Sequence, residues 1–292
     1  MVVGTETMNL SKDLLLKFLC AVLFGKKLYA SDFAEADWKS IFQLADEQTV
    51  SALLLDGMSL LPSECITIPL GDKLKRIATM QRIEQINCLH RKVIVKINQA
   101  LKSEGISVVF MKGQTTALRY PNPLHRTPGD IDFVVNPKDF KKTMEVLEKI
   151  GKVDHGLVHE HHGMAWVDGV TVEPHYKVHN YQSPSTDYAM QEMFASVFPS
   201  ELSSADMDGY AVPVFPPTFE SVFLISHMVN HVYEEGLGLR QVIDYAMFLS
   251  SCADKIDWLQ HHEYLHQMHM ERAWRIFTCI CVDYLGMSLP SQ

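Results

Sequence analysis

Two aspartates, Asp130 and Asp132, stand at the start of an apolar run that continues to Val135. The β-branched and aromatic residues of this run predict a strand. Side chains two positions apart on a strand lie on one face, so both carboxylates point to the same side. Their repulsion is relieved when a cation lies between them, and oxygen ligands suit Mg²⁺ or Mn²⁺. The pattern predicts a sheet with a cation site at a strand end, although two solvated loop acids would give the same short motif.

Strand signals are confined to the middle of the chain. Asp168-Gly169 separates two apolar runs of strand length, which is typical of a hairpin turn. Runs rich in β-branched and aromatic residues predict strands over 106–111, 131–135, 164–167, 170–176 and 210–215.

On both sides of this segment apolar residues recur at helical spacing. Asp37 is predicted to cap one helix that continues through Leu53. A long helix then presents a broad apolar face from Leu74 to Leu101 and ends at Gly105. Helices are also expected over 218–233, 239–250 and from 256 onward. We therefore predict an α+β fold, with a small mixed sheet in a core of residues 105–217, flanked by helical regions over 1–104 and 218–292.

Charge and composition exclude some classes of function. With 26 basic and 35 acidic residues the net charge is −9, which disfavours non-specific binding of duplex nucleic acid. The apolar run from Leu14 to Phe24 is interrupted by Lys17 and is shorter than the ~20 residues of a membrane span. The six cysteines form no Cys-x-x-Cys pair, which indicates reduced thiols. We expect a cytoplasmic protein with no membrane partner.

Lys112-Gly113 lies between the first strand and a short helix predicted over 114–119. The backbone N–H groups and the positive end of a helix in this place suit a phosphate group. Gly113 would let the backbone approach a ligand closely. An ordinary tight turn is the alternative interpretation.

Glu173 lies on the return strand of the hairpin and shares one face with Thr171 and His175. A carboxylate beside apolar residues needs a partner or a metal ion, because burying an unpaired charge is costly. Pro174 predicts that this strand lies at a sheet edge or at a bulge. In the alternative interpretation, Glu173 is a solvent-facing residue of that edge.

The run Lys112-Gly113 followed by Arg126-x-x-Gly129-Asp130-Ile131-Asp132 resembles the polymerase-β-like nucleotidyltransferase superfamily. The segment is most similar to the bacterial uncharacterised nucleotidyltransferase family and more distantly similar to AbiEii-type toxin nucleotidyltransferases. Segment 172–175 resembles the family's later acid-x-His strand. The helical stretch 227–231, followed by 239–244, resembles its C-terminal signature. The chain departs from the superfamily motif at Gln114, where Ser or Gly is usual.

The resemblance implies metal-dependent transfer of NMP from an NTP to a hydroxyl-bearing acceptor, with release of pyrophosphate. The acceptor would be a protein, tRNA or a small molecule. The implied catalytic residues, which are also the ligands of Mg²⁺ or Mn²⁺, are Asp130, Asp132 and Glu173. The implied nucleotide-binding residues are Lys112, Gly113, Gln114, Arg126 and Gly129, and the implied accessory residues are His175, Arg240 and Asp244.

Three alternatives stay open. A protein that binds nucleotide on this fold, has lost turnover and acts as a regulator would explain Gln114. Arg240 and Asp244 are four apart on a predicted helix and would pair with each other in a purely structural role. The 14 histidines allow a zinc hydrolase, although Met228 occupies the Glu position of a His-Glu-x-x-His motif at 227–231.

Overall fold

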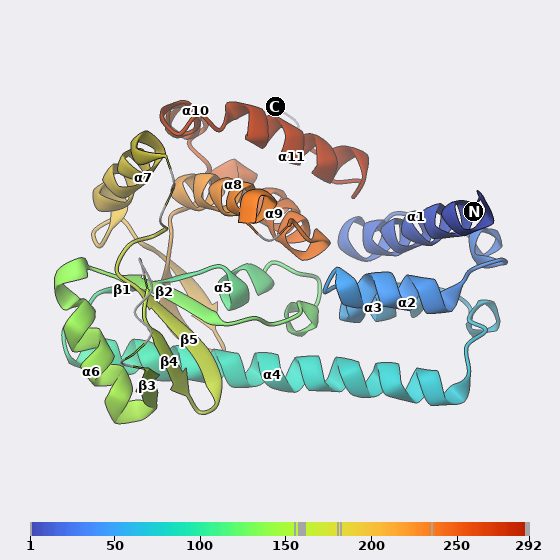
Figure 1. The fold of residues 1–292 in the computed structure, drawn as a ribbon, viewed down its shortest axis with the longest axis horizontal. Helices are drawn as coiled ribbons and strands as arrows, with labels where there is room; N and C mark the ends of the chain where they lie inside the picture. Colours follow the sequence, from blue (N-terminus) through green and yellow to red (C-terminus); the bar gives the residue numbers. More distant parts are fainter. Residues whose placement is uncertain are drawn as a thin grey trace.

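Seven strands within the described residues form one mixed sheet in the computed structural model (Figure 1). The structure describes residues 2–154, 156, 162–179, 181, 183–234 and 236–289, with side chains from residue 10 onward. The strands are β1 (Val108–Met111), β2 (Ile131–Val135), β3 (Lys152–Asp154), β4 (Met164–Val167), β5 (Val170–His175), β6 (Ser203–Met207) and β7 (Tyr210–Val214). Their order is β3-β4-β5-β2-β1-β7-β6, and β2/β5 and β1/β7 are parallel. The predicted α+β class is confirmed.

Helices precede, interrupt and follow the sheet. The α-helices are α1 (Val2–Phe24), α2 (Trp38–Glu47), α3 (Ser51–Met58), α4 (Leu70–Ser103), α5 (Gly113–Ala117), α6 (Phe140–Ile150), α7 (Pro184–Val197), α8 (Pro217–Glu234), α9 (Leu239–Cys252), α10 (Trp258–Gln267) and α11 (Glu271–Asp283). Short 3-10 helices cover Ala30–Phe33, Ser63–Cys65, Pro123–His125, Pro137–Asp139 and Ala253–Lys255. Over the described part of the chain, no helix combines the length and the apolar character that crossing a membrane would require.

Side chains of β2 alternate between two packed layers. Ile131, Phe133 and Val135 pack with α4 and α6 on one face of the sheet, here called the α4 face. Val134 packs with α8 and α9 on the opposite face, here called the α8 face (Figure 1). Asp132 shares the α8 face with Val134, since side chains two apart lie on one side. A register slip of one residue would turn the Asp132 carboxylate into the apolar α4 face, at a large desolvation cost.

One apolar cluster joins the first helices of the chain to the last ones. It contains Phe18 of α1, Phe248 of α9 and Cys281 of α11, all buried. The Cys20 thiol also donates a hydrogen bond to the carbonyl oxygen of Tyr284, 3.2 Å away and 264 positions later in the sequence. Helices from the two ends of the described chain therefore share one core on the α8 face.

The predicted single helix from Asp37 through Leu53 is wrong, because the chain turns between α2 and α3. Thr49 has a φ of 55°, a value that a β-branched residue rarely adopts. The turn directs Gln48 toward α9, where its Oε1 accepts a hydrogen bond from Leu239 N at 2.9 Å. The predicted cap is confirmed, since Asp37 Oδ1 accepts from Ser40 N at 3.2 Å.

The long helix is confirmed as α4, but its predicted apolar face is only half correct. Val93, Ile97 and Leu101 are buried beneath the sheet, whereas Leu74 and Ile77 are 59% and 53% exposed. The N-terminal half of α4 extends past the sheet, so no strand covers it (Figure 1). The division of the chain at residue 104 stays a prediction, and the packing of α4 under the sheet crosses it.

The edge position predicted from Pro174 is wrong, because β5 lies between β4 and β2 inside the sheet. The regular ladder with β4 stops at Val172, which pairs with Ala165. Beyond it, the Gly163 N–H donates to the Pro174 carbonyl oxygen at 2.9 Å. Proline cannot donate the reciprocal bond to the Gly163 carbonyl oxygen, which lies 3.1 Å from His162 Nδ1 instead. Strands β3 and β6 and helix α7 were not predicted from the sequence.

His125 joins two of the N-terminal helices. Its Nδ1 lies 2.7 Å from Asp56 Oδ2 in α3, and its Nε2 lies 2.9 Å from Glu84 Oε1 in α4. The hydrogen bond to Asp56, supported by Glu84, raises the pKa of His125 although burial opposes the charged form.

A raised folded-state pKa gives stability that is fully present below the unfolded-state pKa and is lost as pH rises through the folded-state value. We therefore expect His125→Gln to lower the free energy of unfolding more at about pH 6 than at about pH 8.5. Urea denaturation of both proteins at the two pH values measures this. An equal loss at both would contradict the assignment.

Candidate active site

A cavity of about 430 Å³ opens on the α8 face, between the strand ends of β2 and β5 and the helices α8 and α9. Every residue that the resemblance implied as catalytic, nucleotide-binding or accessory lines it, with the exception of Gln114. Those that do are Lys112, Gly113, Arg126, Gly129, Asp130, Asp132, Glu173, His175, Arg240 and Asp244.

The parallel register of β2 and β5 brings the acids together, because Asp132 and Glu173 are direct partners across the two strands. Next along β5, His175 Nε2 lies 3.0 Å from Asp132 Oδ1 and 3.9 Å from Glu173 Oε2. One ligand atom from each of these three residues lies within 4.8 Å of the others. Asp130 precedes β2 and shares a hydrogen bond with Glu173. Carboxylate oxygens crowded in this way, with one imidazole, fit a divalent cation.

The carboxyl groups shift one another's pKa values. The charge of Asp132, with burial, raises the pKa of Asp130. Burial, with both aspartates, raises the pKa of Glu173 to about 8. Burial would also raise that of Asp132, but Lys112 and His175 outweigh it and hold the pKa well below its usual range. The cluster thus carries negative charge that a bound cation would stabilise.

Lys112 directly follows β1 and has a strained conformation, with φ 54° and ψ −155°. Only glycine adopts this region without cost. Its Nζ lies 3.4 Å from Asp132 Oδ1, so the ammonium group neighbours the acids. Gly113 follows with a φ of 50°, and a Cβ there would lie 3.5 Å from the carbonyl oxygen of Asp130. The backbone at Lys112 and Gly113 therefore lies close to the acids.

Gln114 points away from the cavity. Its Nε2 donates to Asn87 Oδ1 at 2.5 Å, inside the protein. Asn87 Nδ2 in turn donates to the carbonyl oxygens of Leu124 and Arg126, at 2.6 and 2.9 Å. The Gln114 side chain therefore braces the loop before β2, a role that the motif alone did not indicate.

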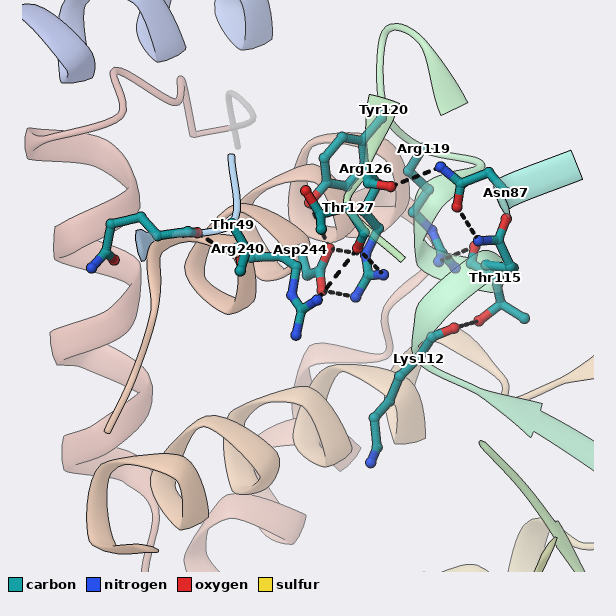
Figure 2. A network of polar contacts seen from close by, with 12 residues as sticks. Thr49, Asn87, Lys112, Thr115, Arg119, Tyr120, Arg126, Thr127, Arg240 and Asp244 are labelled. Carbon is teal, nitrogen blue, oxygen red and sulfur yellow. Dashed lines mark hydrogen bonds and ion pairs between the residues drawn. The ribbon is translucent and has the colours of Figure 1, made fainter. Parts of the chain in front are cut away.

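Asp244 pairs with Arg126 and not with Arg240 (Figure 2). Arg126 Nε and Nη2 donate to the two Asp244 oxygens, each at 2.8 Å, and both side chains are buried. The Tyr120 hydroxyl donates to Asp244 Oδ1 at 2.6 Å. Arg240 Nη1 donates to the carbonyl oxygen of Thr127 at 3.3 Å. The helix-surface pair considered from the sequence is therefore wrong, because Asp244 turns inward to the loop before β2.

A family model described as uncharacterised nucleotidyltransferase matches residues 34–286. The chain belongs to this family. The matched region contains every strand and helix that contributes to the cavity. A comparison with curated proteins finds no match.

Three solved structures show a distant likeness to this nucleotidyltransferase family member. The antibiotic-resistance factor ANT(2″)-Ia in solution is 13% identical, with a TM-score of 0.41 over 66% of this chain and 97% of that one. The same factor in complex with adenylyl-2″-tobramycin is 13% identical, with a TM-score of 0.43 over 61% and 98%. An antigenic nucleotidyltransferase-like protein from Paracoccidioides brasiliensis is 14% identical, with a TM-score of 0.38 over 63% and 91%. No argument about substrate follows from likeness at this level.

Helix α8 gives this family member a cavity wall whose residues were not named as site residues from the sequence, although stretch 227–231 was part of the resemblance. His227, Asn230, His231 and Glu234 all line the cavity. Their spacing places them on one helix face, so helical periodicity together with a site on the sheet could have found them. His227 Nε2 lies 3.1 Å from His231 Nε2.

Histidines also group at 159–162 and at 261–269 in the sequence. His261 is buried with its Nε2 3.0 Å from Ser221 Oγ. His162 lines the cavity, while His159 and His161 lie outside the described residues. Among the described residues, the group that could hold a metal ion is the one with the acids and His175.

The strain at Lys112 predicts that its glycine and alanine variants reverse their usual order of stability. We expect Lys112→Gly to be more stable than Lys112→Ala by about 1–3 kcal/mol, because both lack the ammonium group and only glycine relieves the backbone. Chemical denaturation of both variants measures the difference. Lys138, which has no positive φ, is the matched control, and there glycine should not be the more stable of the two. The same order at both positions would contradict the strain.

The Arg126–Asp244 pair predicts a large loss from a nearly isosteric change. Asp244→Asn leaves the buried guanidinium uncompensated, and we expect a loss of about 3 kcal/mol or more in the free energy of unfolding. Adding Arg126→Gln should recover part of it, so the double variant loses less than the sum of the singles. Asp32→Asn, which breaks the exposed pair with Lys17, should cost less than about 1 kcal/mol. Strict additivity at the buried pair would argue against the coupling.

Proposed function

We propose that this chain transfers NMP from an NTP to a hydroxyl-bearing acceptor and releases pyrophosphate, with a polymerase-β-like arrangement of acids. The observation that supports it is the convergence of Asp130, Asp132 and Glu173 at a cavity beside Lys112, in a member of a nucleotidyltransferase family. Phosphoryl chemistry of this kind depends on positioning and charge neutralisation, for which such a cavity is suited.

The donor set fits Mg²⁺ or Mn²⁺, which the three carboxylates would hold, with His175 adjacent. When bound, such ions neutralise charge on the phosphate oxygens and on the attacking oxygen. Lys112 supplies a point charge for the phosphates. The acceptor oxygen forms its bond to the α-phosphorus while the bond to the bridging oxygen of pyrophosphate breaks, and Glu173 Oε2 takes the hydroxyl proton. His175 holds Asp132 through the 3.0 Å contact.

The alternative is a nucleotide-binding or regulatory protein that has lost turnover. Its main support is Gln114 in place of Ser or Gly. Because this side chain is bonded to Asn87 and does not line the cavity, its identity has no direct effect on a ligand there. Retention of all three acids favours turnover.

The first test is thermal stability with each NTP, with and without Mg²⁺, for the wild type and for Asp130→Asn/Asp132→Asn. A ligand at a hundred times its Kd should add about 2.7 kcal/mol. We expect a metal-dependent shift that the double variant loses. Asp206→Asn/Asp208→Asn, a pair with the same spacing at the end of β6 and in the turn that follows, should keep it. No shift with any NTP in the wild type would contradict the proposal.

The second test separates turnover from binding. With α-labelled NTP and Mg²⁺, the wild type should release pyrophosphate and move the label to candidate acceptors, and the Asp130/Asp132 variant should do neither. Binding without release of pyrophosphate, over a panel of protein, tRNA and hydroxylated small molecules, would favour the regulatory alternative.

A further inference from the structure

Two arginines line the cavity beside the acids, and their surroundings differ. All three nitrogens of the Arg126 guanidinium are engaged within the protein. Nε and Nη2 donate to Asp244, and Nη1 donates to the carbonyl oxygen of Thr127 at 3.3 Å. A guanidinium held by both oxygens of a buried carboxylate has its charge already compensated.

Arg240 carries a charge without such compensation. Its Nη1 donates to the same Thr127 carbonyl oxygen at 3.3 Å, and its Nε is buried without a hydrogen-bond partner. Across the described residues, no carboxylate lies within ion-pair distance of its head group. Figure 2 shows the Arg240 guanidinium beside the Arg126–Asp244 pair, with its outer end directed away from that pair. Buried donors of a cation are costly to leave unmet, so the site favours an anion.

The backbone around Arg240 adds to this preference. Arg240 is the second residue of α9, whose first turn contains no acidic residue. The positive end of a helix dipole disfavours a cation there and favours an anion. Gln48 Oε1, from the turn after α2, binds Leu239 N and holds this first turn in place. Arg240 is therefore fixed in position before any ligand binds.

Arg240 also lies near the acids within the cavity. A Cβ on Gly129 would be 3.9 Å from its Nη1, and Gly129 directly precedes Asp130. The absence of a side chain at Gly129 leaves the space between the guanidinium and the acids open. A polyphosphate bound near the acids would reach Arg240 within the same cavity.

We propose that Arg240 is the arginine that binds the phosphate oxygens of a polyphosphate ligand, and that Arg126 is a positioning residue that holds Asp244 and the loop before β2. This reverses the roles that the sequence resemblance implies for the two residues. The planar guanidinium suits phosphate oxygens, which explains an arginine at this position. The identity of the polyphosphate as an NTP rests on the proposed function, whereas the anion site itself does not.

The experiment is calorimetric titration with inorganic tripolyphosphate and with NTPs, in the presence of Mg²⁺. The variants are Arg240→Ala, Arg240→Lys and Arg126→Ala, and the control is Arg82→Ala on the exposed surface of α4. We expect Arg240→Ala to weaken tripolyphosphate binding at least tenfold, Arg240→Lys to recover part of it, and Arg82→Ala to match the wild type.

The thermal stability of the unliganded variants separates binding from positioning. Arg240→Ala should leave the Tm unchanged or raise it, because an uncompensated cation is removed. Arg126→Ala should lower the Tm strongly, because Asp244 is left buried without its partner. A purely structural role for Arg240 would lower the Tm and leave binding unchanged.

Two outcomes overturn the inference: wild-type protein that binds no tripolyphosphate, and Arg240→Ala protein that binds it with wild-type affinity. Its failure is distinguishable from failure of the proposed function. Arg240-dependent binding of tripolyphosphate without NTP binding or NMP transfer would refute the proposed function and leave the anion site standing. NMP transfer by the wild type, together with wild-type affinity of Arg240→Ala for tripolyphosphate, would refute the anion site and leave the proposed function standing.

Discussion

The parallel pairing of β2 with β5 is the constraint on which the site depends. It places Asp132 opposite Glu173 and sends both carboxyls to the α8 face. The register is held from the opposite side, because Ile131, Phe133 and Val172 fill the apolar layer over α4 and α6. Apolar packing on the α4 face therefore fixes the position of the carboxylates on the α8 face. The repulsion among the acids is tolerated because burial of the apolar layer, at roughly 1.5–3 kcal/mol for each large side chain, outweighs it.

Helices far from the sheet in sequence complete the site. The Arg126–Asp244 pair ties the loop before β2 to α9, and Gln48 ties the start of α9 to the turn after α2. Through Gln48, the N-terminal helices thus help to hold the first turn of α9. Segments that precede the sheet in sequence and segments that follow it therefore both position the cavity wall.

Local signals in the sequence predicted the strands β1, β2, β4, β5 and β7, because alternation and turn chemistry are local. The resemblance to the nucleotidyltransferase family added Arg126, Gly129, Arg240 and Asp244 to the acids at the cavity. Neither predicted that Asp244 prefers Arg126 to Arg240, since that choice depends on which way α9 faces. The interior position of Pro174 was missed for a similar reason: it depends on where β4 stops, which is a property of the neighbouring strand. The turn at Thr49 was missed for another reason: tertiary contacts hold this residue in a conformation that its own type disfavours.

The shared core of α1, α9 and α11 has a consequence for how the protein is made. During synthesis, α1 can pack early against segments that follow it directly, since Phe18 contacts Phe33 and Trp38. Its remaining contacts form much later, since Cys20 meets a partner 264 positions further along. The sheet layer over α4 and α6 can close earlier, from segments that are nearer in sequence. On the ribosome, the part of the N-terminal helices that shares a core with α9 and α11 therefore stays uncovered until those helices are made, and apolar surface of this kind is prone to aggregate during folding.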